Sequence, residues 1–316
     1  MKQLSIVICT YNRSRQLLKL IACLDNDVKF PNDLIIEVII VDNNSTDLTS
    51  SLTKKLLKKA RPYQLRYVIE TKSGLSNARN RGIRESKYNW ICFLDDDILL
   101  ERKFFEALKS ANIEQLNIRC NALKVVNYQI NKPKWYRTDG KYCMLNRGNY
   151  NLGDKSRFLR KDDPLPIGTG MIIHKSIFER IGTFDIRFGY DATKSILIPG
   201  EETEFFLKII QDGVPIYYIH NAIVNHYPEE KKYEINNICR TYKGIGYWYG
   251  RKDALNSKNR ITITYAGFPG AYYKRLFLLT IPYLISRLQF NSTIRNFYLF
   301  EMNHIIGRFL GYKAFR

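Results

Sequence analysis

The sequence predicts an α/β protein whose central, mostly parallel sheet is flanked by helices and followed by a basic helical tail. Three observations lead to this prediction. Short apolar runs alternate with helix-patterned segments over the first hundred residues, and polar residues scarcely interrupt those runs, as in strands buried on both faces. Positive charge accumulates near the C-terminus. With 316 residues, 45% hydrophobic and 25% charged, the chain has the size and composition of a globular protein of one or two domains.

Four strands are expected in the first hundred residues, separated by helices. The strands cover 4–9 (LSIVIC), 37–41 (EVIIV), 65–69 and 90–94 (WICFL). Helices are expected from about Arg15, from about Thr46 and over 74–85. Such β-α-β alternation favours a parallel sheet with helices on both faces.

The second half of the chain is less regular. Residues 112–166 show no clear pattern, and 166–185 predict a glycine-bearing turn, a short strand and a short helix. A helix is expected over 199–213, because Phe205, Phe206, Ile209 and Ile210 follow helical spacing and Gly213 suits a helix C-terminus. Two further strands, IYYI and 222–225, lead to His226.

Polar clusters follow three of the predicted strands directly. Thr10, Tyr11 and Asn12 follow the first, and Asp42, Asn43 and Asn44 follow the second. The stretch FLDDDILL places 95–97, three consecutive aspartates, after the fourth. Ligands of open parallel sheets bind beyond the carboxyl ends of the strands, so these clusters should gather on one rim. A solvated acidic loop, or a cap on a following helix, is the plainer interpretation of the aspartates, but it would not require the other two clusters.

A DxD-type cluster at a strand end supplies the hard oxygen ligands that Mg²⁺ or Mn²⁺ prefers. Such ions are held by one or two carboxylates together with substrate phosphates, so the cluster predicts a phosphate site without a glycine-rich loop. The chain has neither GxxxxGK[ST] nor a GxGxxG after its first strand, which counts against a P-loop ATPase and a dinucleotide-dependent oxidoreductase.

Seven blocks in order carry a resemblance to a known family: SIVICTYNR, VIIVDNNSTD, GLSNARNRGI, FLDDD, GTGMIIHKSIFERIGTFD, GEETEF and VNHYPEE. Together they resemble the inverting family 2 glycosyltransferases of the GT-A fold over roughly 4–226. The resemblance implies a GT-A-like (Rossmann-like) catalytic domain over 1–230, with a nucleotide-sugar half at about 1–111 and an acceptor half at about 112–230. Residues 231–316 would form the basic, aromatic-rich helical region.

The resemblance also implies roles for individual residues. A sugar-nucleotide donor would be bound by Thr10, Tyr11, Asn12, Asp42, Gly74, Asn77, Arg79, Asn80, Asp95 and Asp96. Asp97 and His226 would bind the metal ion, and Gly168 and Gly170 would line the acceptor side. Met171 and His174 depart from the family's commoner residues, which leaves the acceptor unidentified.

Transfer of a sugar to a hydroxyl group requires a base that takes the hydroxyl proton. In the family an acidic pair at a helix start supplies it from the second member, which here makes Glu202 the expected base beside Glu201. The family more usually has Asp at that second position. Acidic side chains also favour a helix N-terminus through the helix dipole, so a purely structural role for Glu201, Glu202 and Glu204 is the plainer alternative.

Other candidates have plain interpretations too. A carboxylate after a strand, such as Asp42, is more often a turn residue than a ligand. Arg79 on a short helix would usually be a solvated surface charge, and His226 could be a strand-end histidine whose hydrogen bonds are satisfied. For these three, the expected position on the rim is what favours function.

The formal net charge of +20 indicates an anionic partner. From Arg240 to Arg316 there are 13 Lys and Arg against only Asp253 and Glu301. No nucleic-acid-binding signature accompanies this charge. The segment 272–290, YYKRLFLLTIPYLISRLQF, is too short and too interrupted to cross a membrane, but its basic flanks and tyrosines suit an interfacial segment. A buried helix that packs on the catalytic domain is the competing interpretation.

We therefore predict a metal-dependent glycosyltransferase that moves a sugar, most simply from a UDP-sugar, to a hydroxyl of a glycan or lipid-linked acceptor in cell-surface polysaccharide or glycolipid synthesis. A nucleotidyltransferase, or a non-enzymatic membrane- or nucleic-acid-binding module, are the alternatives. Six scattered cysteines without a CxxC pair, and an N-terminus without a secretory pattern, lead us to expect a cytoplasmic protein, peripheral on the inner face of the membrane.

Overall fold

The computed structural model describes residues 1–128, 132–139, 141, 144, 148–191, 196–257, 264–265 and 268–315. The chain divides into two compact units. The sheet unit comprises Met1–Gln129, Gly148–Arg187 and Glu201–Pro228, and the helical unit comprises Ile130–Arg147, Phe188–Gly200 and Glu229–Arg316. The further division of 1–230 into a nucleotide half and an acceptor half stays a prediction.

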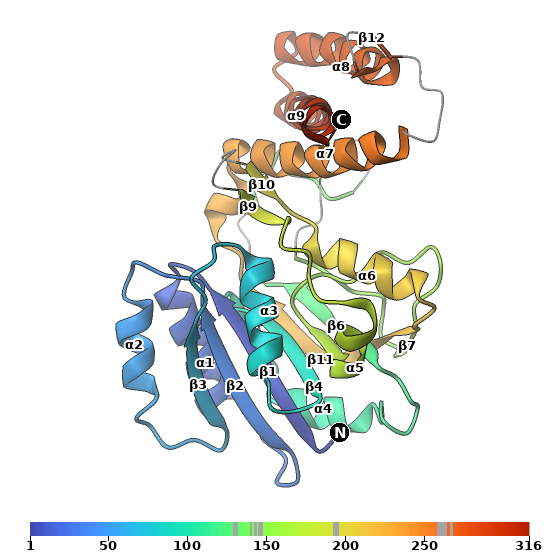
Figure 1. The fold of residues 1–316 in the computed structure, drawn as a ribbon. Helices are drawn as coiled ribbons and strands as arrows, with labels where there is room; N and C mark the ends of the chain where they lie inside the picture. Colours follow the sequence, from blue (N-terminus) through green and yellow to red (C-terminus); the bar gives the residue numbers. More distant parts are fainter. Residues whose placement is uncertain are drawn as a thin grey trace. The chain divides into compact units, whose positions relative to one another are not determined.

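The sheet unit is built on one mixed sheet with the strand order β3-β2-β1-β4-β8-β6-β11-β5, and β7 pairs with β11 (Figure 1). The strands are β1 Gln3–Thr10, β2 Ile35–Asp42, β3 Gln64–Ile69, β4 Trp90–Asp95, β5 Ile98–Leu100, β6 Cys120–Asn127, β7 Arg157–Phe158, β8 Met171–His174 and β11 Ile216–His226. β1 to β4 run parallel, as do β6 and β11, and β8 is antiparallel to both β4 and β6. The carboxyl ends of β1, β2, β4, β6 and β11 therefore share one rim.

Helices cover the two faces of this sheet (Figure 1). They are α1 Ser14–Asn26, α2 Thr49–Leu56, α3 Leu75–Glu85, α4 Phe104–Ser110, α5 Lys175–Ile181 and α6 Glu201–Gln211. α3 packs on β1 and β2, α1 contacts β5, and α4 contacts β11. Because β1 and β4 are covered on both sides, their apolar residues are almost fully buried, which accounts for the nearly continuous apolar runs LSIVIC and WICFL.

The α/β prediction is confirmed, and its first four strands lie where expected to within two residues. Two details differ. The strands expected at IYYI and 222–225 are one strand, β11, whose register against β6 shifts between Ile219 and Ile223. A bulge of this kind lets the strand continue through the polar residues His220 and Asn221, which a pattern of apolar runs cannot show. The unassigned segment 112–166 contains β6, a central strand, and β7.

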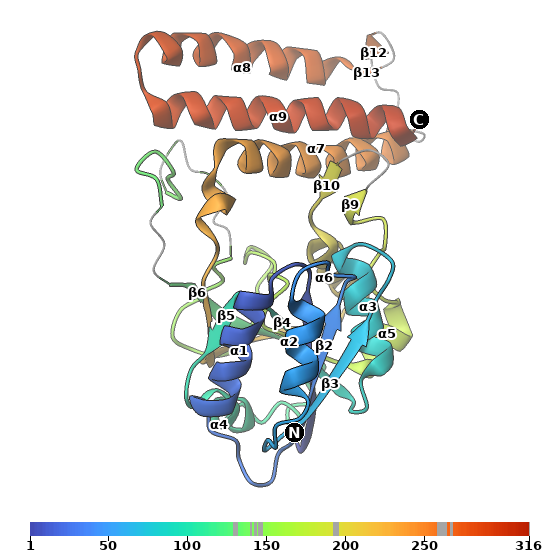
Figure 2. The ribbon, with the colours of Figure 1, turned by 90° about the vertical axis from the view of Figure 1, so that its left-hand side faces the viewer.

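The helical unit contains three long helices, α7 Ile235–Ser257, α8 Gly270–Leu288 and α9 Ser292–Phe315. Its shorter elements are the 3-10 helix η1 Glu230–Tyr233 and two small hairpins, β9 Gly189–Asp191 with β10 Ile196–Ile198 and β12 Thr264–Tyr265 with β13 Phe268–Pro269. α9 packs against both α7 and α8, and Figure 2 shows α9 between them. Aromatic side chains such as Tyr242 and Phe300 fill the contact between α7 and α9.

Glycines bring the backbones of α7 and α9 into direct contact. A Cβ atom built on Gly246 would lie 1.9 Å from the carbonyl oxygen of His304, and one on Gly250 would lie 2.1 Å from that of Arg308. The reverse holds for Gly307 and Gly311 on α9, whose Cβ atoms would lie 2.0 and 1.9 Å from carbonyl oxygens of α7. No residue with a side chain fits at these four positions unless the helices separate.

No helix in the described part of the chain combines the length and the apolarity needed to cross a membrane. Among the described residues no disulfide links Cys9, Cys23, Cys92, Cys120 or Cys239, and Cys143 lies outside the described residues.

Candidate active site

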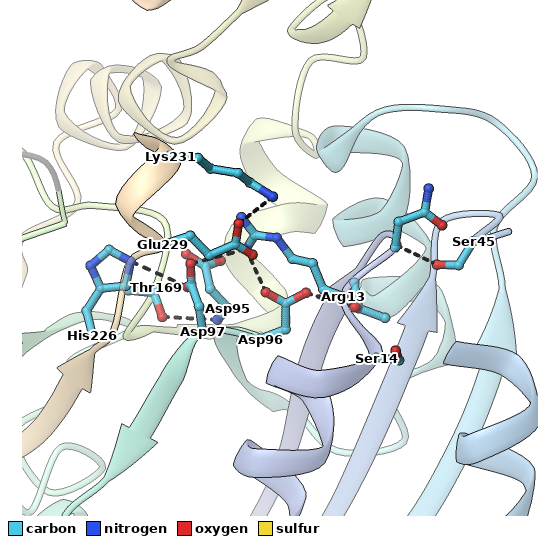
Figure 3. Close-up of polar contacts among 12 residues, drawn as sticks. Arg13, Ser14, Ser45, Asp95, Asp96, Asp97, Thr169, His226, Glu229 and Lys231 are labelled. Atoms are coloured by element: carbon cyan, nitrogen blue, oxygen red, sulfur yellow. Dashed lines mark hydrogen bonds and ion pairs between the residues drawn. The ribbon is translucent and has the colours of Figure 1, made fainter. Parts of the chain in front are cut away.

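The three aspartates lie where the parallel part of the sheet ends (Figure 3). Asp95 is the last residue of β4, and Asp96 and Asp97 form the turn before β5. Asp96 and Asp97 are buried, and Asp95 is partly exposed. Neither buried carboxylate precedes a helix, so the capping interpretation does not apply. Burying adjacent like charges is costly unless each has a partner.

The partners of Asp96 come from β1 and the loop that follows it. Thr10 Oγ1 donates a hydrogen bond to Asp96 Oδ2 at 2.8 Å. Arg13 Nη1 donates to Asp96 Oδ1 at 2.8 Å and to Asp97 Oδ2 at 3.1 Å (Figure 3). Burial raises the pKa of Asp96 to about 6; Arg13 opposes this shift, and Asp97 adds to it. The guanidinium group of Arg13 therefore compensates part of the negative charge of the turn.

His226 approaches the other side of Asp97. It ends β11, and its Nε2 atom lies 3.4 Å from Asp97 Oδ1 (Figure 3). Its Nδ1 atom lies 2.8 Å from Asn127 Oδ1, so each ring nitrogen has a polar neighbour. The ring is also tightly enclosed, because a Cβ atom on Gly148 would lie 2.1 Å from its Nδ1. The position of His226 is thus set by backbone as well as by hydrogen bonds.

Arg79 links the aspartates to the acidic start of α6. Its side chain is buried, its Nη1 donates to Glu201 Oε1 at 2.8 Å, and its Nη2 lies 3.8 Å from Asp95 Oδ1. The guanidinium carbon lies 5.4 Å from the centre of the Phe184 ring. Burial acts to lower the pKa of Arg79, but Glu201 and Asp95 raise it by more, so the group stays charged. Arg79 is therefore a buried ion-pair partner, and the surface-charge alternative is wrong.

Glu202 follows Glu201 in the first turn of α6 and is partly buried. Burial raises the pKa of Glu202, the negative charge of Glu201 raises it further, and Arg79 opposes the shift. A carboxylate with a raised pKa is a stronger base once it is deprotonated. Since Arg79 joins Glu201 to Asp95, the N-terminal turn of α6 lies beside the aspartate turn, as the sequence predicts.

The loops after β1 and β2 are tied together at the same rim. Asn12 adopts a positive φ of 52°, and its Oδ1 accepts a hydrogen bond from the Thr46 amide at 2.7 Å. Asp42 is buried; its Oδ1 accepts from the Ser45 amide at 2.8 Å and its Oδ2 accepts from the Tyr67 hydroxyl at 2.6 Å. Asp42 therefore fulfils the plain turn role. Its place at the end of β2 is also the predicted one.

Four other predicted donor residues lie in the loop after β1, just before α3 or on α3. Tyr11 is exposed, and Gly74, at a φ of 119°, precedes α3 and donates its amide to Asn43 Oδ1 at 2.7 Å. Asn77 donates to the Ser73 carbonyl oxygen. Asn80 differs from these, because its side chain forms two hydrogen bonds with the backbone of Phe184. The contacts of Asn77 and Asn80 are thus to backbone and not to the aspartates.

The predicted acceptor-side glycines precede β8. Gly168 packs against Arg79, since a Cβ atom there would lie 2.2 Å from Arg79 Nη2. Gly170 has a φ of 78° and donates its amide to the Phe93 carbonyl oxygen. Between them Thr169 accepts a hydrogen bond from the Asp95 amide at 3.1 Å (Figure 3). This segment therefore supports both Arg79 and the end of β4.

Sequence reasoning placed Asn43 in the polar cluster after the second strand as a turn residue, and did not single out Arg13 or Thr169. Arg13 follows Tyr11 and Asn12 directly, so its place in a rim cluster was the available signal. Asn43 holds three backbone groups, those of Glu70, Lys72 and Gly74, and Thr169 holds Asp95. No sequence signal identifies these partners, because they are distant in the chain from Asn43 and Thr169.

The side chains at the rim suit a divalent metal ion whose coordination is completed by a substrate. Nowhere among the described residues do three or more His, Cys, Asp or Glu side chains form a cage for a metal ion. Asp97 and His226 nevertheless bring one carboxylate and one imidazole to the same point. One or two protein ligands together with phosphate oxygens form a common arrangement for Mg²⁺ and, with imidazole, are acceptable to Mn²⁺.

The fold and the acidic rim together define a protein of the GT-A class. The model for "Glycosyl transferase family 2" matches residues 5–182. In a solved structure of GalNAc-T7 with UDP, GalNAc and Mn²⁺, the fold superposes with a TM-score of 0.55 at 16% identity, covering 81% of this chain and 51% of that one. The chain belongs to glycosyl transferase family 2, and the predictions of family, fold and enzyme class are confirmed.

Two curated relatives match most of the chain. One is chondroitin synthase from Pasteurella multocida, 24% identical over 71% of this chain and 24% of that protein. The other, from Methanococcus voltae, is named dolichyl N-acetyl-alpha-D-glucosaminyl phosphate 3-beta-D-2,3-diacetamido-2,3-dideoxy-beta-D-glucuronosyltransferase and is 25% identical over 72% of this chain and 67% of that protein. The chain spans a quarter or less of the length of several curated relatives.

Proposed function

We propose that this protein transfers a sugar, with inversion at the anomeric carbon, from a UDP-sugar to a hydroxyl of a glycan or lipid-linked acceptor, assisted by Mn²⁺ or Mg²⁺. The observation that carries the proposal is the convergence of Asp95, Asp96 and Asp97 with His226 and with the Arg79–Glu201 pair at the carboxyl rim of the sheet. Family membership favours this function over a nucleotidyltransferase or a non-enzymatic binding module.

The donor half of the proposal rests on the rim. The loops after β1 and β2 are joined by the hydrogen bond between Asn12 and Thr46. From these loops Asp42 and Tyr11 would contact the nucleotide base of the donor. Asp95 would hold the ribose. Asp97 and His226 would hold the metal ion, which when bound neutralises negative charge on the diphosphate leaving group. The fold neighbour GalNAc-T7, whose solved structure contains UDP and Mn²⁺, supports this choice of nucleotide and ion.

The acceptor half rests on α6. Glu202 would accept the proton of the attacking hydroxyl group, and its raised pKa matches that task near neutral pH. Glu201, which is bound by Arg79, would fix the start of α6 and so the position of Glu202. One relative is named a chondroitin synthase, and the other is a glucuronosyltransferase named for a dolichyl glucosaminyl phosphate. These names support a glycan or lipid-linked acceptor. A lipid-linked acceptor would place the reaction at a membrane surface.

Thermal unfolding in the presence of sugar nucleotides tests the donor site. A ligand that binds only the folded state raises the melting temperature. We expect UDP with Mn²⁺ to stabilise the protein and ATP and NAD not to. In Asp97→Ala the Mn²⁺-dependent part of UDP binding should fall about 10- to 100-fold or more. Asp154→Ala, at an exposed carboxylate, is the control and should bind like the original. Equal binding by Asp97→Ala would contradict the metal assignment.

Turnover tests the base. Glu202→Gln should lower the turnover number by about 10²- to 10⁴-fold, because the acceptor hydroxyl loses its proton acceptor. UDP binding should persist in this variant. Glu204→Gln, in the same turn of α6, is the matched control and should keep its activity. A Glu202→Gln variant with normal turnover would exclude Glu202 as the base.

A further inference from the structure

One helix of the helical unit presents a wide apolar face that no described residue covers. On α8 six large hydrophobic side chains are at least 47% exposed, namely Phe277, Leu278, Ile281, Leu284, Ile285 and Leu288. Tyr273 is 38% exposed and packs its ring against Phe309 of α9. We call these six residues the apolar face of α8. At 3.6 residues per turn they fall within roughly 120° of the helix circumference. The opposite side of α8 is packed: Leu276, Leu279 and the buried Tyr272 lie in a cluster with α9 residues such as Ile305 and Tyr312.

The charges around this face have one sign. α8 contains Lys274, Arg275 and Arg287, all exposed, and no acidic residue. On the helical projection Lys274 lies within the apolar arc, and Arg275 and Arg287 lie on opposite sides of it. Arg275 also pairs with Glu301 of α9 at 2.9 Å and remains about half exposed. An apolar strip bordered by cations on both sides is the pattern of a helix that lies in the plane of an anionic membrane surface.

From these observations we propose that α8 inserts its apolar face into the interfacial layer of a membrane that contains anionic lipids. α8 has 19 residues with Pro282 inside, and no described helix is apolar enough to span a bilayer, so the helix lies on the surface. A second copy of the chain is a less favourable occupant. In a two-fold, antiparallel pairing of α8 helices, Lys274 and Arg275 would face Arg287 of the other copy, and like charges would meet.

Sedimentation of the full chain with vesicles tests the proposal. The probes are vesicles of phosphatidylcholine alone and vesicles with about one third phosphatidylglycerol. We expect binding to the anionic vesicles, and at least about tenfold weaker binding by Phe277→Ser/Leu288→Ser, because the loss of two large side chains reduces the buried apolar area. The two residues are 66% and 79% exposed, respectively, so the change should not unfold the protein.

Matched variants distinguish vesicle binding through the apolar face of α8 from non-specific hydrophobic binding. Leu48→Ser/Ile186→Ser changes two residues of the sheet unit that are 65% and 62% exposed, and it should bind vesicles like the original. Lys274→Gln/Arg287→Gln should weaken binding to anionic vesicles only. Absence of vesicle binding would overturn the proposal. If vesicles were not bound, sedimentation velocity could also show a dimer that Phe277→Ser/Leu288→Ser dissociates. The apolar face of α8 would then be a contact between two copies of the chain, and the proposal would be overturned. UDP binding should be unchanged in all these variants, so failure here is distinct from failure of the donor site.

Discussion

Different kinds of contact stabilise the interior of the sheet unit and the interior of the helical unit. In the sheet unit the rim that carries the candidate site is a network of buried and partly buried charges. Arg13 and Arg79 compensate four carboxylates contributed by the end of β4, the β4–β5 turn and α6. In the helical unit the central contact, α7 against α9, is backbone on backbone through four glycines. The difference teaches that the same sequence depends on charge pairing in one region and on the absence of side chains in the other.

The largest effect should follow from removing Arg79. Arg79→Met leaves Glu201 buried without its cation, and breaking a buried ion pair costs about 3–5 kcal/mol. Denaturant unfolding measures this loss. In Arg79→Met/Glu201→Met both charges are gone, so most of the stability should return. A double variant that is no more stable than Arg79→Met would show that the rim does not depend on this pair.

A somewhat smaller loss should follow in the helical unit from one added methyl group. Gly307→Ala places a Cβ atom 2.0 Å from the Lys243 carbonyl oxygen, and overpacking of this kind costs about 3 kcal/mol. Gly213→Ala is the control: its Cβ meets no atom within 4 Å, so only the strain of its positive φ remains, about 1 kcal/mol. If unfolding shows equal losses for the two variants, the glycines of α7 and α9 are not essential to the contact.

The pH dependence of stability sharpens the view of the rim. The pKa of Glu202 is raised in the folded protein, so the folded state binds its proton more tightly than the unfolded chain does. Stability should therefore fall as pH rises from the ordinary glutamate value, 4.5, toward the raised one. Glu202→Gln should flatten this slope in unfolding curves across that range. Turnover should change in the opposite sense and rise with pH, because the deprotonated form is the base.

The smallest effect is expected for a charge in the helical unit. Arg275→Gln breaks an ion pair with Glu301 whose cation is about half exposed, and such pairs contribute about 1 kcal/mol or less. Thermal unfolding at low and high salt should show little difference between this variant and the original. A loss comparable to that of Arg79→Met would mean that charge supports both regions equally.

The sequence was sufficient for the sheet unit wherever one strand could be recognised from its own residues. Strands β1, β2 and β4 are nearly unbroken apolar runs, and the polar clusters at their ends follow from the parallel arrangement. β6 was missed because its residues, CNALKVVN, mix polar and apolar types; it is a strand only because β8 and β11 pair with it. Local pattern cannot reveal a strand that depends on its neighbours.

The candidate site was predictable in its carboxylates and less so in their supports. Asp97, His226 and Glu202 were named from motifs, and the structure places His226 beside Asp97 and Glu201 against Arg79. Arg79 was expected at the donor but is occupied with Glu201, and Thr169 was not expected at all. The support of a side chain by a residue about a hundred positions away depends on the tertiary fold, which no spacing in the chain encodes. The catalytic and ligand roles themselves stay predictions.

The interlocked glycines of α7 and α9 have a consequence for how this protein can be altered. If every residue of the three long helices were replaced in turn, positions 246, 250, 307 and 311 should accept almost no alternative, whereas the six positions of the apolar face of α8 should accept many without loss of folding. The exposed surface of α8 could therefore be redesigned while the α7–α9 contact is left unchanged. Such a change would alter what α8 binds and leave the fold of the helical unit intact.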